Sequence, residues 1–160
     1  MTTDKSKQDV LSWNVKRIAT ALKITPEEVR QYFTDGRRVS FVLERRLASE
    51  VLLGKITGDE GAGYDIVDKD GHKWEVRSIT KDGIYFSPSY MVGSGRKFNE
   101  EGFLKKLKEV EGYIAADVES FPDVPFWMVP SMQVLRWWKS GKLGTITKVS
   151  RKTALKLLNP

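Results

Sequence analysis

The chain has 160 residues, of which 40% are apolar, enough for one domain with a substantial core. It contains no cysteine and a single histidine, which excludes disulfides, thiolate metal sites and His-rich zinc sites and argues against a histidine-based triad, so any metal is expected to bind through oxygen. The excess of 27 Lys and Arg over 21 Asp and Glu gives a net charge of +6, which favours a polyanionic partner.

No apolar run approaches the roughly 20 residues that a membrane span requires, and the polar segment Met1 to Asp9 is unlike a signal peptide. We therefore expect a soluble, cytoplasmic protein without a membrane partner. No composition break or internal repeat indicates a second domain, so residues 1–160 are predicted to form a single domain.

Helices are predicted in the N-terminal third of the chain. Apolar residues recur at helical spacing over residues 6–23. A second helix follows, because Thr25 suits the N-cap, Pro26 suits the first helical position and Glu28 completes a capping box. The pair has the rhythm of a helix-turn-helix that reads DNA, although two packed helices that form a platform or a dimer surface are the simpler interpretation.

A third helix is predicted to run to about Leu53, with an apolar stripe that covers a sheet. The stripe repeats every fourth residue through Val39, Leu43, Leu47 and Val51. Residues 54–63, with four glycines, are expected to form a flexible connection to the next element.

The most informative segment is residues 63–79, which has the pattern of a β-hairpin with a Lys-Asp-Gly turn. Pairing across this turn places Asp65 directly opposite Glu75. Because side chains alternate along a strand, Lys73 and Arg77 share the face of the two acids, whereas the residues between them turn toward a core.

Two carboxylates whose Cβ atoms lie roughly 5 Å apart repel each other unless a cation lies between them. Carboxylate oxygens suit Mg²⁺, and a bound Mg²⁺ polarises a phosphoryl oxygen and activates water while a basic side chain stabilises the developing charge. Asp65 and Glu75 are therefore predicted to bind Mg²⁺, with Mn²⁺ as a substitute, for phosphodiester hydrolysis. No nucleotide cofactor is expected.

An acid at the start of a hairpin followed by Glu-x-Arg on the returning strand resembles the PD-(D/E)XK nucleases, and more narrowly the compact, PvuII-type type II restriction endonucleases. Asp65 matches the first acidic position, Glu75 the second and Arg77 the lysine position. The resemblance also implies that the backbone carbonyl of Val76 is a metal ligand. It is strongest over residues 60–98 and looser toward the C-terminus.

Arginine at the lysine position departs from the pattern, because a guanidinium stays protonated and cannot share a proton. One hypothesis moves the lysine role to Lys73, about 6.6 Å away along the same face. A second keeps Arg77 in place as a two-point phosphate ligand. A third is a binding protein with a decayed site.

The resemblance also implies that an acid on the helix before the hairpin sometimes joins the metal site. Glu44 or Glu50 is the candidate, and a solvated surface charge is the simpler interpretation of either.

After a second Lys-Asp-Gly turn, residues 83–87 are predicted to form a third strand that completes a β-meander. The following loop, rich in hydroxyls and small residues, is the predicted DNA-recognition element, the alternative being an ordered surface loop with incidental charge. The predicted DNA-binding residues are Ser87, Ser89, Tyr90, Ser94, Arg96 and Lys97.

The C-terminal part is predicted to add two short strands and three helices. The expected elements are a helix capped by Asn99 and ending at Glu111, strands at 113–118 and 125–129, a helix capped by Ser131 and a short helix capped by Ser150. Asp117 is either an acid near the site or a satisfied polar residue at a strand end.

The predicted fold is α+β with α/β/α layers, in which helices flank a five-stranded mixed sheet. Nuclease cores of the resembling family share this order. The resemblance therefore implies a restriction-endonuclease-like fold with an N-terminal helical region, residues 1–53, and a nuclease-like core, residues 54–160.

The expected function is Mg²⁺-dependent endonucleolytic cleavage of double-stranded DNA by a type II restriction enzyme. A homodimer would place one Asp65/Glu75 site on each strand of a palindromic target. The alternatives are a junction-resolving or repair nuclease of the same fold, a non-catalytic DNA-binding protein, and an interaction module whose acids only decorate the surface.

Overall fold

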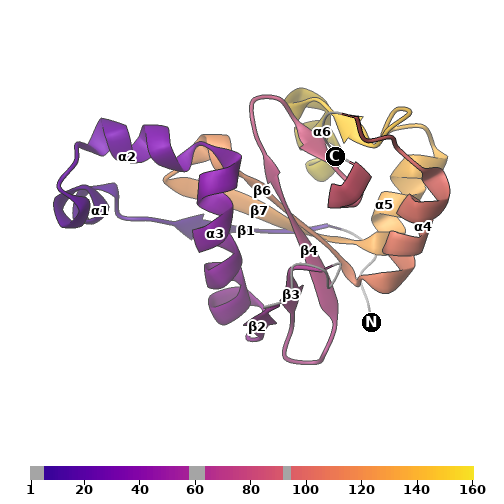
Figure 1. The fold of residues 1–160 in the computed structure, drawn as a ribbon, viewed down its shortest axis with the longest axis horizontal. Helices are drawn as coiled ribbons and strands as arrows, with labels where there is room; N and C mark the ends of the chain where they lie inside the picture. Colours follow the sequence, from indigo (N-terminus) through magenta and orange to yellow (C-terminus); the bar gives the residue numbers. More distant parts are fainter. Residues whose placement is uncertain (1–5, 58–63, 92–94) are drawn as a thin grey trace.

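The computed structural model describes residues 6–57, 64–91 and 95–160 of the chain (Figure 1). Within these ranges the fold is α+β, with a mixed six-stranded sheet and a small two-stranded sheet. The order in the main sheet is β1 (Lys7–Ser12), β7 (Asp123–Pro130), β6 (Gly112–Asp117), β4 (Lys73–Ile79), β3 (Ile66–Val67) and β2 (Lys55–Ile56). The small sheet pairs β5 (Ile84–Tyr85) with β8 (Lys148–Val149).

Helices cover both faces of the main sheet. They are α1 (Val15–Leu22), α2 (Pro26–Phe33), α3 (Gly36–Arg46), α4 (Glu100–Glu109), α5 (Ser131–Lys139) and α6 (Arg151–Leu158), with a π-helical turn at Leu47–Val51 and 3₁₀ turns at Ser89–Met91 and Val118–Ser120. In Figure 1, α1 to α3 lie on one side of the sheet and α4 to α6 on the other. Each group closes its own apolar core against the sheet, so the predicted layering of helices on both faces is confirmed.

The prediction of five strands is wrong: the main sheet gains β2 from the segment predicted as a flexible connection and β1 from the segment predicted as the start of a helix, and it loses β5 to the small sheet. β1 pairs antiparallel with β7, with Leu11 opposite Val124. The helix begins only after Asn14, whose side chain accepts a hydrogen bond from the amide of Arg17 at 3.0 Å. Val10 and Leu11 continue the helical spacing of the apolar residues in α1, so the sequence pattern does not separate β1 from α1. The two elements are separated by the pairing of β1 with β7, more than 100 residues away in the chain. The N-terminal region therefore contributes a strand to the sheet.

The predicted β-meander is also wrong. β4 lies between β3, which is antiparallel to it and pairs only with its first two residues, and β6, which is parallel to it and pairs along most of its length. The chain reverses between Thr80 and Gly83, where Gly83 has φ 102° and a Cβ would lie 2.0 Å from the carbonyl oxygen of Val149. β5 consequently joins β8 and leaves the end of β4 open.

Three of the four predicted N-caps are confirmed. Thr25 and Glu28 form the reciprocal capping box, with bonds of 3.0 and 3.1 Å. Asn99 and Ser150 accept from the third amide of their helices. Ser131 is instead the first residue of α5, and its hydroxyl donates to the carbonyl of Val110 at 2.7 Å, so it joins the helix to the sheet rather than capping it.

The stripe predicted on the third helix is confirmed, because Val39, Leu43 and Leu47 are completely buried against the sheet. This packing fixes which face of α3 looks toward the hairpin. None of the helices in the described residues is both long and apolar enough to cross a membrane.

Candidate functional site

The hairpin has the predicted register. β3 and β4 pair with Ile66 opposite Trp74, and the amide of Asp65 donates to the carbonyl of Trp74 at 3.0 Å. The ladder between β3 and β4 ends at this pair, and Asp65 lies just beyond it, near enough to Glu75 for the charge of Glu75 to raise the pKa of Asp65. Gly71, with φ 86°, makes the tight turn, since only glycine adopts this conformation at little cost.

At Asp65 the side chain replaces the backbone as the partner of β4. Its Oδ2 accepts a hydrogen bond from the amide of Val76 at 2.8 Å, which holds the carboxylate at the open edge of the strand. Burial, followed by the negative charge of Glu75, raises the pKa of Asp65 above its ordinary value, despite the hydrogen bond from Val76. The ionised form of Asp65 is therefore disfavoured in this position, and a nearby cation would stabilise it.

Glu75 is buried, with 4% of its surface exposed, and its charge is balanced by the chain itself. Oε1 lies 2.8 Å from Nη2 of Arg77, and Oε2 lies 2.9 Å from Nζ of Lys106 on α4. The Lys106 ammonium is outside hydrogen-bonding angles at Oε2, so this contact is ionic. Glu75 thus differs from a solvent-open metal ligand, because two cations already hold it.

Arg77 ties three parts of the site together. Besides Glu75, its guanidinium donates to the carbonyl of Val76 at 3.2 Å and to the carbonyl of Ser87 at 2.9 Å. Lys73, the other candidate for the lysine role, is exposed and lies over the ring of Tyr64, 5.0 Å from its centre. The structure therefore brings Arg77, and not Lys73, against the carboxylates.

The two acids considered on the preceding helix separate clearly. Glu44 is half-buried beside Asp65, and its pKa rises to about 7, first through burial and then through the charge of Asp65. Glu50 is exposed and pairs with Arg46 at 2.5 Å, a hydrogen bond that lowers its pKa. Glu44 belongs to the site, and Glu50 is a surface ion pair.

Of these residues, Glu44, Asp65, Val76 and Arg77 line a pocket of about 550 Å³ at the open edge of β4. Its walls come from α3, the hairpin, the end of β4 and the start of the 3₁₀ turn at residue 89; the lining residues are Asp35, Ser40, Glu44, Asp65, Val76, Arg77, Ser78, Thr80 and Ser89. β3 is only two residues long, so the strand edge past Asp65 is left for the pocket. The shortness of β3 therefore leaves the pocket accessible.

The pocket offers oxygen ligands of the kind that a hard divalent cation takes. The charge of Asp65 raises the pKa of Glu44, and the charge of Glu75 raises the pKa of both Glu44 and Asp65. Acids outnumber cations in the lining, where Asp35, Glu44 and Asp65 stand against Arg77, and the carboxylate oxygens lie beside Val76. Glu75 would join such a site only if the ion displaced one of its cations.

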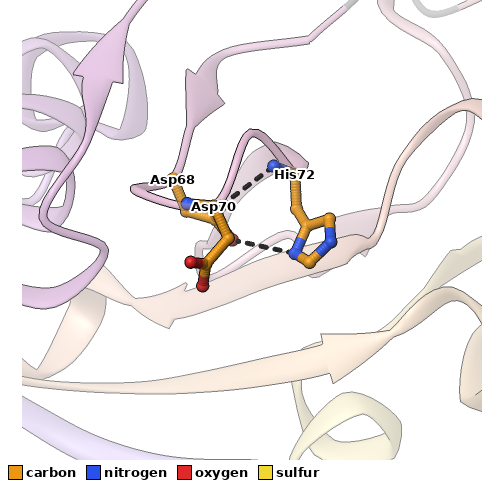
Figure 2. Close-up of side chains that lie close together, drawn as sticks. All are labelled: Asp68, Asp70 and His72. Atoms are coloured by element: carbon orange, nitrogen blue, oxygen red, sulfur yellow. Dashed lines mark hydrogen bonds and ion pairs between the residues drawn. The ribbon is translucent and has the colours of Figure 1, made fainter.

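A second acidic group lies at the hairpin turn and has a structural explanation. Asp68, Asp70 and His72 cluster there (Figure 2) and form the one group in the described residues with at least three candidate ligand atoms within 4.8 Å of one another. Asp68, however, uses its oxygens to accept from the amides of Asp70 and His72 and from Nε1 of Trp74, each at 2.9 Å. The cluster shapes the turn.

The predicted DNA-binding residues are divided between two pockets and the surface. Ser87 lines the same pocket as Arg96 and Lys97, but it is buried and its hydroxyl donates to the carbonyl of Ile146. Ser89 lines the carboxylate pocket and Tyr90 is exposed. Ser94 lies outside the described residues.

Arg96 and Lys97 line a neighbouring pocket of about 440 Å³ that also includes Tyr85. Lys148 lies over the Tyr85 ring, 5.1 Å from its centre, which adds a third cation from the C-terminal segment. This basic pocket is suited to phosphate.

Asp117 is a polar residue at a strand end, as the simpler interpretation predicted, but only Oδ2 is satisfied, because Oδ1 is buried without a hydrogen-bond partner. It is buried at the end of β6 and accepts from Arg151 at 2.5 Å and Ser120 at 2.9 Å.

Lys106 is the site residue that sequence reasoning missed. It follows Phe103 by three residues and precedes Val110 by four, so it lies on the stripe of α4 that packs on the sheet. A lysine on an apolar stripe indicates a buried partner, and its identity depends on the tertiary structure.

Comparison of the chain with protein-family models, with curated proteins and with solved structures found no match.

Proposed function

We propose that the chain is a Mg²⁺-dependent endonuclease that hydrolyses phosphodiester bonds of double-stranded DNA, with a restriction-endonuclease-like fold. The observation that carries the proposal is the cluster of Asp65 and Glu75 beside β4, with Glu44 near Asp65 and with Arg77 and Lys106 on Glu75. The mixed sheet with helices on both faces supports it.

Glu44, Asp65 and the carbonyl of Val76 would hold the ion, and Glu75 would complete the set. Bound there, Mg²⁺ would supply Lewis-acid stabilisation to a phosphodiester undergoing hydrolysis. The residues of the chain fix the geometry: the amide of Val76 orients Asp65, and Arg77 bridges Glu75 and the carbonyl of Ser87. The Arg77 guanidinium also stabilises negative charge that develops at the pocket.

The basic pocket of Arg96, Lys97 and Lys148 would hold the backbone of the strand beside the scissile phosphate. We further propose that the protein acts as a homodimer, since two copies of one site cut both strands of a duplex. Light scattering during size-exclusion chromatography measures the oligomeric state with and without DNA.

The proposal is tested by incubating supercoiled plasmid with the protein at several Mg²⁺ and Mn²⁺ concentrations, beside Asp65→Asn, which keeps the size of the side chain but removes its charge. Discrete fragments from the wild type and a loss of at least about 100-fold in the variant are expected. A smear indicates a relaxed nuclease, and cleavage of branched but not linear duplex indicates a junction-resolving enzyme. Equal cleavage by the variant contradicts the proposed site.

One observation favours a non-catalytic DNA-binding protein as the second candidate. Both oxygens of Glu75 are balanced by Arg77 and Lys106, so the pair is stable without any added ion. This candidate predicts salt-sensitive DNA binding in EDTA and intact plasmid at every metal concentration.

A further inference from the structure

Lys106 is a charged side chain in an apolar setting. It lies on α4 with 6% of its surface exposed, beside Phe103 and Leu107 of the second core. Removing an ammonium from water is unfavourable unless an anion compensates it. The compensating anion is Glu75, with Nζ 2.9 Å from Oε2.

The position of this ammonium connects α4 to the carboxylate site. Its field also reaches Asp65, whose pKa it lowers against the larger effects of burial and of Glu75. The other lysines of the helix, Lys105 and Lys108, are exposed. Among the lysines of α4, Lys106 alone is directed at the acids.

We propose that Lys106 supplies the cation that the nuclease pattern places on the strand, and that it acts as a positioning residue for Glu75. Neither of the two strand candidates does this alone. Arg77 is spread over Glu75 and the carbonyls of Val76 and Ser87, and Lys73 lies over Tyr64. The inference rests on the proposed function, because the ion and the phosphodiester are those of the same pocket.

A positive charge at this place has two opposite effects. It competes with a metal ion for Glu75, so its removal makes the pocket more negative and strengthens Mg²⁺ binding. It also keeps Glu75 in one buried geometry beside the reacting phosphate, so its removal slows turnover. A residue that only stabilised the fold would weaken metal binding and turnover together.

The experiment compares Lys106→Met with Lys105→Met, a matched change on the exposed side of the same helix. Mg²⁺ affinity is measured by calorimetric titration and by the metal-induced rise in melting temperature, and cleavage by kcat and KM for a plasmid. For Lys106→Met we expect Mg²⁺ affinity to rise about 5-fold. We expect kcat to fall about 100-fold with KM within about 2-fold, since the residue is buried away from DNA.

Lys106→Arg keeps the charge and should retain kcat within about 10-fold of the wild type. Lys105→Met should change neither quantity. Equal or weaker Mg²⁺ binding by Lys106→Met, or a kcat like that of Lys105→Met, overturns the role of Lys106.

The metal titration separates this inference from the proposed function. A wild-type protein that binds Mg²⁺ but cuts no plasmid overturns the nuclease proposal, and tighter binding by Lys106→Met then still supports Lys106 as the cation at the carboxylates. A wild type that binds no Mg²⁺ overturns both.

Discussion

The carboxylates at the pocket and the neighbouring Glu75 differ in charge balance, although they lie on adjacent elements. Glu75 is buried deepest and is paired with two cations, whereas Glu44 and Asp65 are less buried but lack such pairing. The difference arises because α4 contributes Lys106 on the side of Glu75, while α3 contributes another acid on the side of Asp65. An added cation would therefore stabilise Glu44 and Asp65, whereas Glu75 already has Arg77 and Lys106 beside it.

Glu44 should make stability depend on pH. Its pKa is higher in the folded chain, about 7, than in the unfolded one, so the folded state binds more protons and stability falls as pH rises from about 4.5 to 7. Glu44→Gln should raise the melting temperature at pH 8 without metal by about 3 °C, corresponding to about 1 kcal/mol once partial exposure is allowed for.

Scanning calorimetry between pH 4.5 and 8 measures this gain, which should vanish at the acidic end. Glu50→Gln is the control, since that side chain lies at the surface with Arg46. A constant difference between Glu44→Gln and the wild type across the pH range would contradict the assignment. With Mg²⁺ added, the advantage of Glu44→Gln should disappear, because the variant lacks a ligand.

At the scale of elements, the hairpin turn shows how a local motif fixes the register that the site requires. Asp68 accepts from two turn amides and from Nε1 of Trp74, which belongs to the core. Partial burial opposes ionisation of Asp68, but these hydrogen bonds outweigh it and lower the pKa. The carboxylate thus joins the turn to the packed face of β4 and supports the register of β3 with β4.

Asp68→Ala should therefore destabilise the fold by about 2 kcal/mol, a fall of about 6 °C in melting temperature. The matched control is Asp70→Ala, an exposed acid of the same turn. Thermal unfolding in EDTA is the measurement. A loss that appears only when metal is present, or one equally large for Asp70→Ala, would identify the cluster of Figure 2 as a cation site instead.

At the scale of the whole molecule, charge is divided between neighbouring pockets. The carboxylate pocket has three acids in its lining, Asp35, Glu44 and Asp65, while the basic pocket has Arg96 and Lys97 with Lys148 nearby. DNA binding should depend on the basic pocket even without metal, whereas cleavage should need both pockets.

Fluorescence anisotropy with a labelled duplex in EDTA tests this division. Arg96→Ala and Lys97→Ala should each weaken binding and reduce the slope of log K against log salt by about 1, because each removes one phosphate contact. Lys16→Ala on α1, in the opposite helical layer, should leave the slope unchanged. Unchanged slopes for both pocket variants would remove this pocket from the DNA interface.

The sequence by itself determined the features that depend on near neighbours. The turn residues and the strand alternation were enough to give the register in which Ile66 lies opposite Trp74, and cap chemistry was enough to start helices after Thr25, Asn99 and Ser150. These interactions span a few residues, so their geometry follows from spacing.

Tertiary structure alone decided what sits beside each element. β1 became a strand because β7 offered an edge, and β5 left the meander because β6 and β8 took the available pairings. The same holds for Lys106, whose role comes from the packing of α4 against the face that carries Glu75. Sequence spacing cannot show such contacts, because the two partners meet only after the sheet has ordered its strands.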